Sequence, residues 1–110
     1  MKIKRALSIR QPFAEQIMGG KKKWEYRGRR TNIRERVYVY ASKTPGPAER
    51  WKKVRREPGE LPVGVLVGSV EIAACKGNRG DYAWKLVRPK RLKRLLKPKT
   101  HPQPAFFYPF

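Results

Sequence analysis

The sequence predicts an α+β fold: a small, mostly antiparallel or mixed β-barrel with two or three short helices. Several segments alternate apolar and polar residues, as half-buried strands do, and only a few short stretches are helix-prone. The most apolar run, residues 61–75, is rich in Val and carries Gly64 and Gly68, which is typical of a strand that bends or bulges as barrels require. A chain of 110 residues predicts a single domain over residues 1–110.

The first half of the chain predicts a strand, a short helix and two more strands. Residues 2–9 alternate loosely and predict the first strand. Pro12 suits the first position of a helix, because its missing N–H would have no partner there. Apolar residues spaced four apart over 13–18 give that helix one buried face, and Gly19-Gly20 ends it. Residues 23–27 and 36–42 predict strands.

The second half predicts a helix and three strands. Residues 44–47 break the preceding strand, and residues 48–57 predict a helix that stops at Pro58-Gly59. One long strand over 61–75, a turn over 76–80 and a strand over 82–87 follow. Residues 89–99 fit either a short basic helix or a strand with a tail. Residues 104–110 are too aromatic for a free tail, so we expect a closing strand and the order β-α-β-β-α-β-β-β.

Alternation within residues 23–27 divides that strand between two faces. We expect Trp24 and Tyr26 to pack in the core and the charged residues to share the opposite face. In so basic a surround, the Glu25 carboxylate should be ionised. Two interpretations stay open: Glu25 orients Arg27 as a brace, or it accepts a hydrogen bond from a base edge or sugar while Arg27 and Lys22 hold phosphate.

Net charge is the strongest compositional feature. The chain has 28 Lys and Arg against 8 Asp and Glu, a formal charge of +20. Self-repulsion on this scale favours a polyanionic partner, and nucleic acid is the commonest one. An acidic protein, a membrane surface or a heat-adapted exterior are the alternatives. Heat adaptation usually raises Glu along with Lys, and acids are scarce here.

Cysteine, histidine and hydropathy exclude several classes of protein. A single cysteine, Cys75, cannot build a disulfide framework or a zinc site of about four ligands, and His101 has no second histidine. We therefore expect no metal and no cofactor. No apolar run approaches the roughly twenty residues that span a bilayer, and no apolar signal core follows the basic N-terminus. These features predict a cytoplasmic protein without membrane contact. The sequence leaves the oligomeric state open, with a monomer favoured.

Three short blocks resemble the signature of one known family. Residues 8–12 (SIRQP), 20–22 (GKK) and 25–27 (EYR) are similar to the opening of ASCH domains, the activating-signal-cointegrator-homology domains related to PUA folds. That opening has a serine four residues before a proline, then G-x-K, then E-x-R. Residues 37–43, 61–70 and 82–86 continue the resemblance over nearly the whole chain.

The resemblance implies a PUA-like barrel with a cleft beside the first helix, and RNA or DNA binding. Some members resemble amidohydrolases that act on N4-acylated cytidine through a lysine, a threonine three residues later and a distant glutamate; others are reported as ribonucleases. Here Lys22 matches the lysine, but Glu25 stands at the threonine position, which removes the hydroxyl nucleophile. Whether the chain is an enzyme stays open. If it is one, Lys22 and Glu25 are the catalytic candidates, acting as acid and base.

Residues around the first strand and its neighbours are the candidate ligand contacts. Ser8, Arg10 and Gln11 lie where the first strand meets the helix, and can either cap the helix or contact an anion. By the resemblance, Lys43 lines the cleft from the end of the strand at 36–42. The full set of expected nucleic-acid contacts is Ser8, Arg10, Gln11, Lys21, Lys22, Lys23, Glu25, Arg27, Arg29, Arg30 and Lys43.

These observations predict a nucleic-acid-binding module, for RNA or else DNA, that uses a basic cleft. A nucleoside-sized substrate does not require a charge of +20, so the charge favours a polynucleotide. A small hydrolase of the same fold is the alternative, and a protein-interaction module within a larger assembly is a third. One aromatic residue among Trp51, Tyr82, Trp84 and the run 106–108 is expected to stack on an unpaired base.

Overall fold

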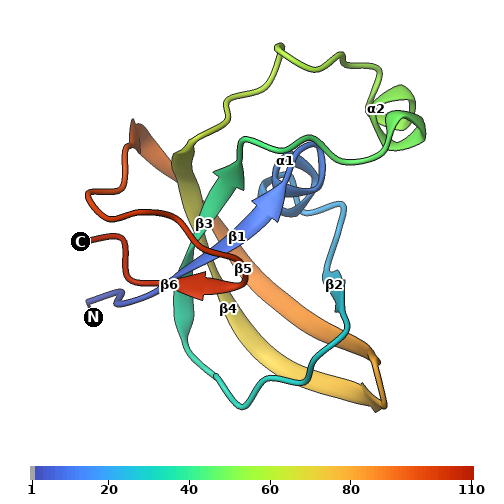
Figure 1. Ribbon diagram of the computed structural model, residues 1–110, viewed down its shortest axis with the longest axis vertical. Coiled ribbons are helices and arrows are strands. Elements are labelled where there is room, and N and C mark those ends of the chain that lie inside the picture. Colours follow the sequence, from blue (N-terminus) through green and yellow to red (C-terminus); the bar gives the residue numbers. More distant parts are fainter. Residues whose placement is uncertain (1) are drawn as a thin grey trace.

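The computed structural model describes residues 2–110, and its elements follow the order β-α-β-β-α-β-β-β that the sequence predicts (Figure 1). The sheet is mixed and six-stranded and two helices accompany it, so the small α+β class is confirmed. The elements are β1 (Ala6–Arg10), α1 (Phe13–Met18), β2 (Trp24–Arg27), β3 (Arg36–Ser42), α2 (Ala48–Val54), β4 (Val65–Asn78), β5 (Asp81–Leu96) and β6 (Phe106–Phe107).

The sheet has the strand order β2-β5-β4-β3-β1-β6, and β1 and β3 form its parallel pair. Within residues 2–110 no ladder joins β2 to β6, so the sheet is not closed into the predicted barrel. Flat strands about 4.8 Å apart would hold β5 and β6 well away from each other, yet Trp84 of β5 and Phe106 of β6 stack at 5.5 Å. The sheet is therefore strongly curled, and side chains rather than backbone bonds bridge its two edges.

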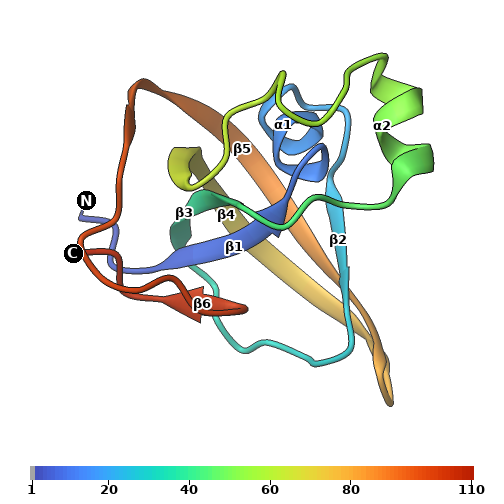
Figure 2. The same ribbon diagram turned by 45° about the horizontal axis from the view of Figure 1, so that its top comes forward.

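Irregular pairing along β4 produces this curvature. The register of β4 shifts once against β3 and three times against β5, as a bulged strand does. The predicted long, bent strand is thus confirmed, although it runs later in the chain than residues 61–75. Gly68 has a separate role: a Cβ there would overlap the Met18 sulfur and the Lys90 carbonyl oxygen, so only glycine lets α1 pack this closely on the sheet. The β4–β5 hairpin projects beyond the other strands (Figure 2).

Helix α1 covers the core with the face that the sequence predicts. Ala14, Ile17 and Met18 are buried among the residues of β1, β3 and β4. Pro12 lies just before the first helical residue, and Gly20 follows the helix with φ +78°, a conformation that glycine adopts without steric cost. Neither helix in the part of the chain described is long and apolar enough to cross a membrane.

The C-terminal part of the chain continues β5 and then returns to β1. Residues 89–96 extend β5, so the strand-with-tail alternative is confirmed and the basic helix is wrong. The expected closing strand is β6, which pairs antiparallel with Ala6 and Leu7 of β1. Phe107 packs edge-on against Tyr40 in a second, smaller hydrophobic cluster. The aromatic C-terminal segment is therefore part of the fold.

The two faces of β2 are the reverse of those predicted. Glu25 is buried and faces inward, opposite Trp84 of β5. Tyr26 is exposed, and Trp24 is only half-buried, with the ammonium groups of Lys76 and Lys85 over its ring. The prediction failed because Lys22 and Arg27 compensate the buried carboxylate, and a pattern of apolar and polar residues does not reveal such ion pairs.

Candidate nucleic-acid interface

An open cavity of about 960 Å³ lies between β2 and the carboxyl ends of β1 and β3. Because β1 and β3 are parallel, their last residues, Arg10 and Ser42, are paired neighbours and both line it. Phe13 of α1, residues 63–65 and the segment 97–104 supply the remaining walls. A cavity of this size is at the upper end of the range for ligand sites, about 300–1,000 Å³.

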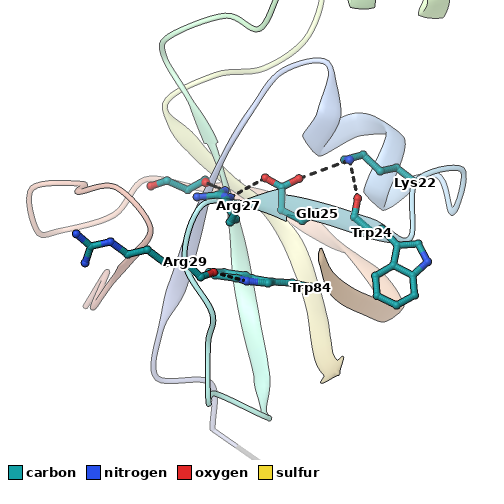
Figure 3. Close-up of polar contacts among 7 residues, drawn as sticks. Lys22, Trp24, Glu25, Arg27, Arg29 and Trp84 are labelled. Atoms are coloured by element: carbon teal, nitrogen blue, oxygen red, sulfur yellow. Dashed lines mark hydrogen bonds and ion pairs between the residues drawn. The ribbon is translucent and has the colours of Figure 1, made fainter. Parts of the chain in front are cut away.

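A chain of polar contacts runs beside the cavity from Lys22, in the loop after α1, through β2 to β1 (Figure 3). The Lys22 ammonium lies 3.7 Å from Glu25 Oε1 and donates to the Trp24 carbonyl oxygen at 2.6 Å. On the other side, Arg27 Nε donates to Glu25 Oε2 at 2.9 Å. Arg27 Nη2 donates to the Ser8 carbonyl oxygen at 2.7 Å. This last bond ties β2 to β1 across the open edges of the sheet.

Both oxygens of the Glu25 carboxylate therefore have cationic partners inside the protein. Its side chain is 11% exposed, and those of Lys22 and Arg27 are also mostly covered. The hydrogen bond from Arg27 fixes the orientation of this carboxylate and of the guanidinium relative to each other. The geometry matches the brace interpretation, in which Glu25 orients Arg27 and neutralises part of the charge around the cavity.

Lys22 has an environment that disfavours its charge. Burial lowers the pKa of its ammonium group below the ordinary value, and Glu25 offsets part of that shift. The amine also lies 5.3 Å from the ring centroid of Phe13 and 5.1 Å from that of Tyr26, within cation–π range of both. Lys22 thus contacts both the Glu25 carboxylate and the two aromatic rings at the rim of the cavity.

Four cationic side chains line the cavity: Arg10, Arg27, Lys43 and Lys97. Glu25 is the one acid in that lining and is already paired. Arg10 and Lys43 are exposed, and neither side chain makes a hydrogen bond or ion pair with another residue in the part of the chain described. The stem of Lys43 passes over the backbone at position 64, where a Cβ would come 2.9 Å from Lys43 Cε.

The sequence profile of ASCH domains matches residues 7–93. The chain belongs to the ASCH domain family. A crystal structure of ASCH from Zymomonas mobilis is similar, with a TM-score of 0.66 over 94% of this chain and 85% of that one. At 16% sequence identity, the likeness establishes the shared fold alone. A comparison with curated protein sequences finds no significant match.

The fold gathers some of the expected ASCH contact residues at the cavity and leaves others elsewhere. Ser8, Arg10, Glu25, Arg27 and Lys43 line it. Lys22 lies directly behind Glu25 rather than in the lining. The remaining exposed cations in the expected set contribute nothing to the lining; they are Lys21, Lys23, Arg29 and Arg30.

Gln11 has a structural position instead. It is 1% exposed, its Oε1 accepts the backbone N–H of Glu15, and its Nε2 donates to the Pro62 carbonyl oxygen, both at 2.9 Å. For Gln11, capping is the interpretation that this geometry matches, because its side chain satisfies an N–H in the first turn of α1.

One wall of the cavity was not anticipated from the sequence. Residues 97–104 lie beyond the part of the chain that the ASCH profile matches, yet Lys97, Thr100, His101 and Gln103 all line the cavity. Ser8 holds this segment against β1: its Oγ donates to the Gln103 carbonyl oxygen and its N–H to the Ala105 carbonyl oxygen, both at 2.9 Å. Local patterning carries no signal of this wall, because it forms only when the chain folds back from β5 to β1.

Proposed function

We propose that this ASCH domain binds nucleic acid, RNA in the first place, in the cavity between β2 and the ends of β1 and β3. The observation that best supports this proposal is the charge of the cavity lining. Four cationic side chains line one cavity, and its single carboxylate is already paired with cations of the protein. Arg10 and Lys43 are exposed and unpaired in the part of the chain described, so phosphate contacts would not have to displace internal partners. RNA takes precedence over DNA because ASCH domains are thought to bind RNA.

Net charge supports a polymeric ligand rather than a single nucleotide. A formal charge of +20 far exceeds what the cavity itself presents. Exposed lysines and arginines outside the cavity would extend phosphate contacts along a strand, each releasing condensed counterions. Binding should therefore weaken steeply as salt concentration rises.

The test is a salt series of anisotropy titrations with labelled single-stranded RNA, single-stranded DNA and their duplexes. The variant Arg10→Gln/Lys43→Gln removes two charges from the cavity. Two lost phosphate contacts should flatten the log–log salt slope on a single strand by about 1.4, since each contributes roughly 0.7. The control Lys52→Gln/Lys53→Gln removes two exposed charges from α2, outside the lining. Equal losses in the two variants would overturn the cavity as the binding site.

A second candidate function, hydrolysis of RNA or of N4-acylated cytidine, has one observation in its favour. Burial lowers the pKa of Lys22, and its amine lies beside the Glu25 carboxylate, an arrangement that suits acid–base chemistry. Incubation with RNA and with N4-acetylcytidine, followed by chromatography of the products, tests it. A product that disappears in Lys22→Met and persists in the neighbouring Lys23→Met supports hydrolysis; unchanged substrate throughout refutes it.

A further inference from the structure

Tyr26 is exposed in a way that the rest of the fold does not explain. The residue is 66% exposed, the most of any large hydrophobic residue in the part of the chain described, although it lies in the middle of β2. The aromatic residues that the sequence favours for stacking are largely engaged elsewhere. Trp84 is buried, stacks on Phe106 and donates its Nε1–H to the Arg29 carbonyl oxygen at 2.9 Å.

The Tyr26 ring is held in place despite its exposure. Its backbone pairs with Ala83 in the β2–β5 ladder. The Lys22 ammonium lies 5.1 Å from the ring centroid, and that ammonium is itself fixed by the Trp24 carbonyl oxygen and Glu25. A ring ordered before binding loses little conformational freedom when a ligand stacks on it.

The ring also lies at the right place for a nucleotide. Tyr26 lines the same cavity as Arg27, its neighbour on β2, and as Arg10 and Lys43 on the far side. A strand whose phosphates contact these cations would carry its bases within reach of the cavity rim. An aromatic face beside a cationic groove is the combination by which proteins bind unpaired nucleotides.

We propose that Tyr26 stacks on an unpaired base at the rim of the cavity, and that the ligand of this domain is therefore single-stranded. This inference rests on the proposed function and adds the class of nucleic acid. In a duplex both faces of each internal base are covered by its neighbours, so the Tyr26 ring has nothing to stack on. Single strands, loops and strand ends present the bases that it needs.

The experiment compares three variants by anisotropy on one single-stranded RNA and on the duplex of the same sequence. Tyr26→Ala should weaken single-strand binding by roughly five- to hundredfold, the usual effect of removing one stacking ring. Tyr26→Phe retains the ring and should stay close to the unmodified protein. Tyr108→Ala is the matched control: Tyr108 is 58% exposed with the Arg5 guanidinium 5.6 Å from its ring centroid, but lies outside the cavity lining.

The salt slope separates this inference from the function on which it rests. Tyr26→Ala should lower affinity without changing the slope, because no phosphate contact is lost. If Tyr26→Ala binds as well as Tyr108→Ala while Arg10→Gln/Lys43→Gln binds poorly, the stacking inference fails and the proposed function stands. If duplex binds as tightly as single strand and Tyr26→Ala leaves both unchanged, the inference also fails. If no nucleic acid binds the unmodified protein, the proposed function fails first.

Discussion

Replacing Glu25 with glutamine removes one negative charge from the inner wall of the cavity while keeping the shape of the side chain. In the native protein, Glu25 Oε2 accepts a hydrogen bond from Arg27 at 2.9 Å, and Oε1 lies 3.7 Å from the Lys22 ammonium. The substitution leaves two largely covered cations without their counter-ion. Such a loss is more costly than the loss of an exposed pair.

The expected magnitude follows from these two contacts. The Arg27 guanidinium stays charged in the variant, so its hydrogen bond to the new amide oxygen keeps one charged partner, and losing the other charge should cost about 1 kcal/mol. The Lys22 pair is longer and partly covered, and we assign it about 1 kcal/mol, between exposed and buried pairs. The free energy of unfolding should therefore fall by about 2 kcal/mol, and Tm by about 8–16 °C for a domain of this size.

Urea unfolding followed by tryptophan fluorescence and circular dichroism measures this loss, with an unchanged m-value indicating that the denatured state is the same. Glu71→Gln is the matched control. Glu71 also pairs with two cations, Arg88 at 2.8 Å and Arg36 at 3.6 Å, but its side chain is 37% exposed against 11% for Glu25. It should lose less than about 1 kcal/mol. If the two variants lose equal stability, coverage by the protein does not set the strength of the Glu25 contacts.

Three further predictions concern packing and titration. Gly68→Ala should destabilise the protein by about 1–3 kcal/mol, because the new methyl group overlaps the Met18 sulfur and the Lys90 carbonyl oxygen. Urea unfolding measures the loss, and the same substitution should cost less in a Met18→Ala background, where the sulfur is absent. Burial lowers the pKa of Lys22, so between that lowered pKa and 10.5 the unfolded chain binds more protons than the folded protein, and stability rises with pH. Urea unfolding at several alkaline pH values measures this rise, which should be smaller in Lys22→Met. The hydrogen bonds from Arg91 lower the pKa of Glu15. This carboxylate therefore stabilises the fold above its unfolded pKa of 4.5, and the effect is lost as pH falls through the folded pKa. In urea unfolding, Glu15→Gln should be less stable than the unmodified protein near neutral pH and equally stable in acid.

The order of elements could be predicted from the sequence because each segment carries its own local pattern. The glycine stop after α1, the alternation of residues 36–42 and the glycine-interrupted run that became β4 each follow from backbone and side-chain preferences. Closure of the sheet could not be predicted this way. Whether the edges meet as a ladder depends on the lengths of β2 and β6, four and two residues, and on side chains such as Arg27 that bridge the remaining gap.

The candidate site was predictable only where the family motif reaches it. Arg10, Arg27 and Lys43 line the cavity as expected. The prediction of which face of β2 points inward was wrong. Period-two patterning assigns Glu25 to solvent and cannot anticipate that Lys22 and Arg27 stabilise its carboxylate inside the protein. Because of the same reversal, Tyr26 lies at the rim of the cavity, although the sequence predicted it to pack in the core.

The wall formed by residues 97–104 lies outside the part of the chain that identifies the family. The ASCH profile ends at residue 93, so two chains can share every matched residue and still differ in this wall of the cavity. Substitutions or length changes after residue 96 can accumulate without disturbing the curled sheet, provided that β6 still reaches β1. A change of sequence or length in this returning segment would therefore reshape one wall of the proposed binding cavity and leave the matched part of the chain intact.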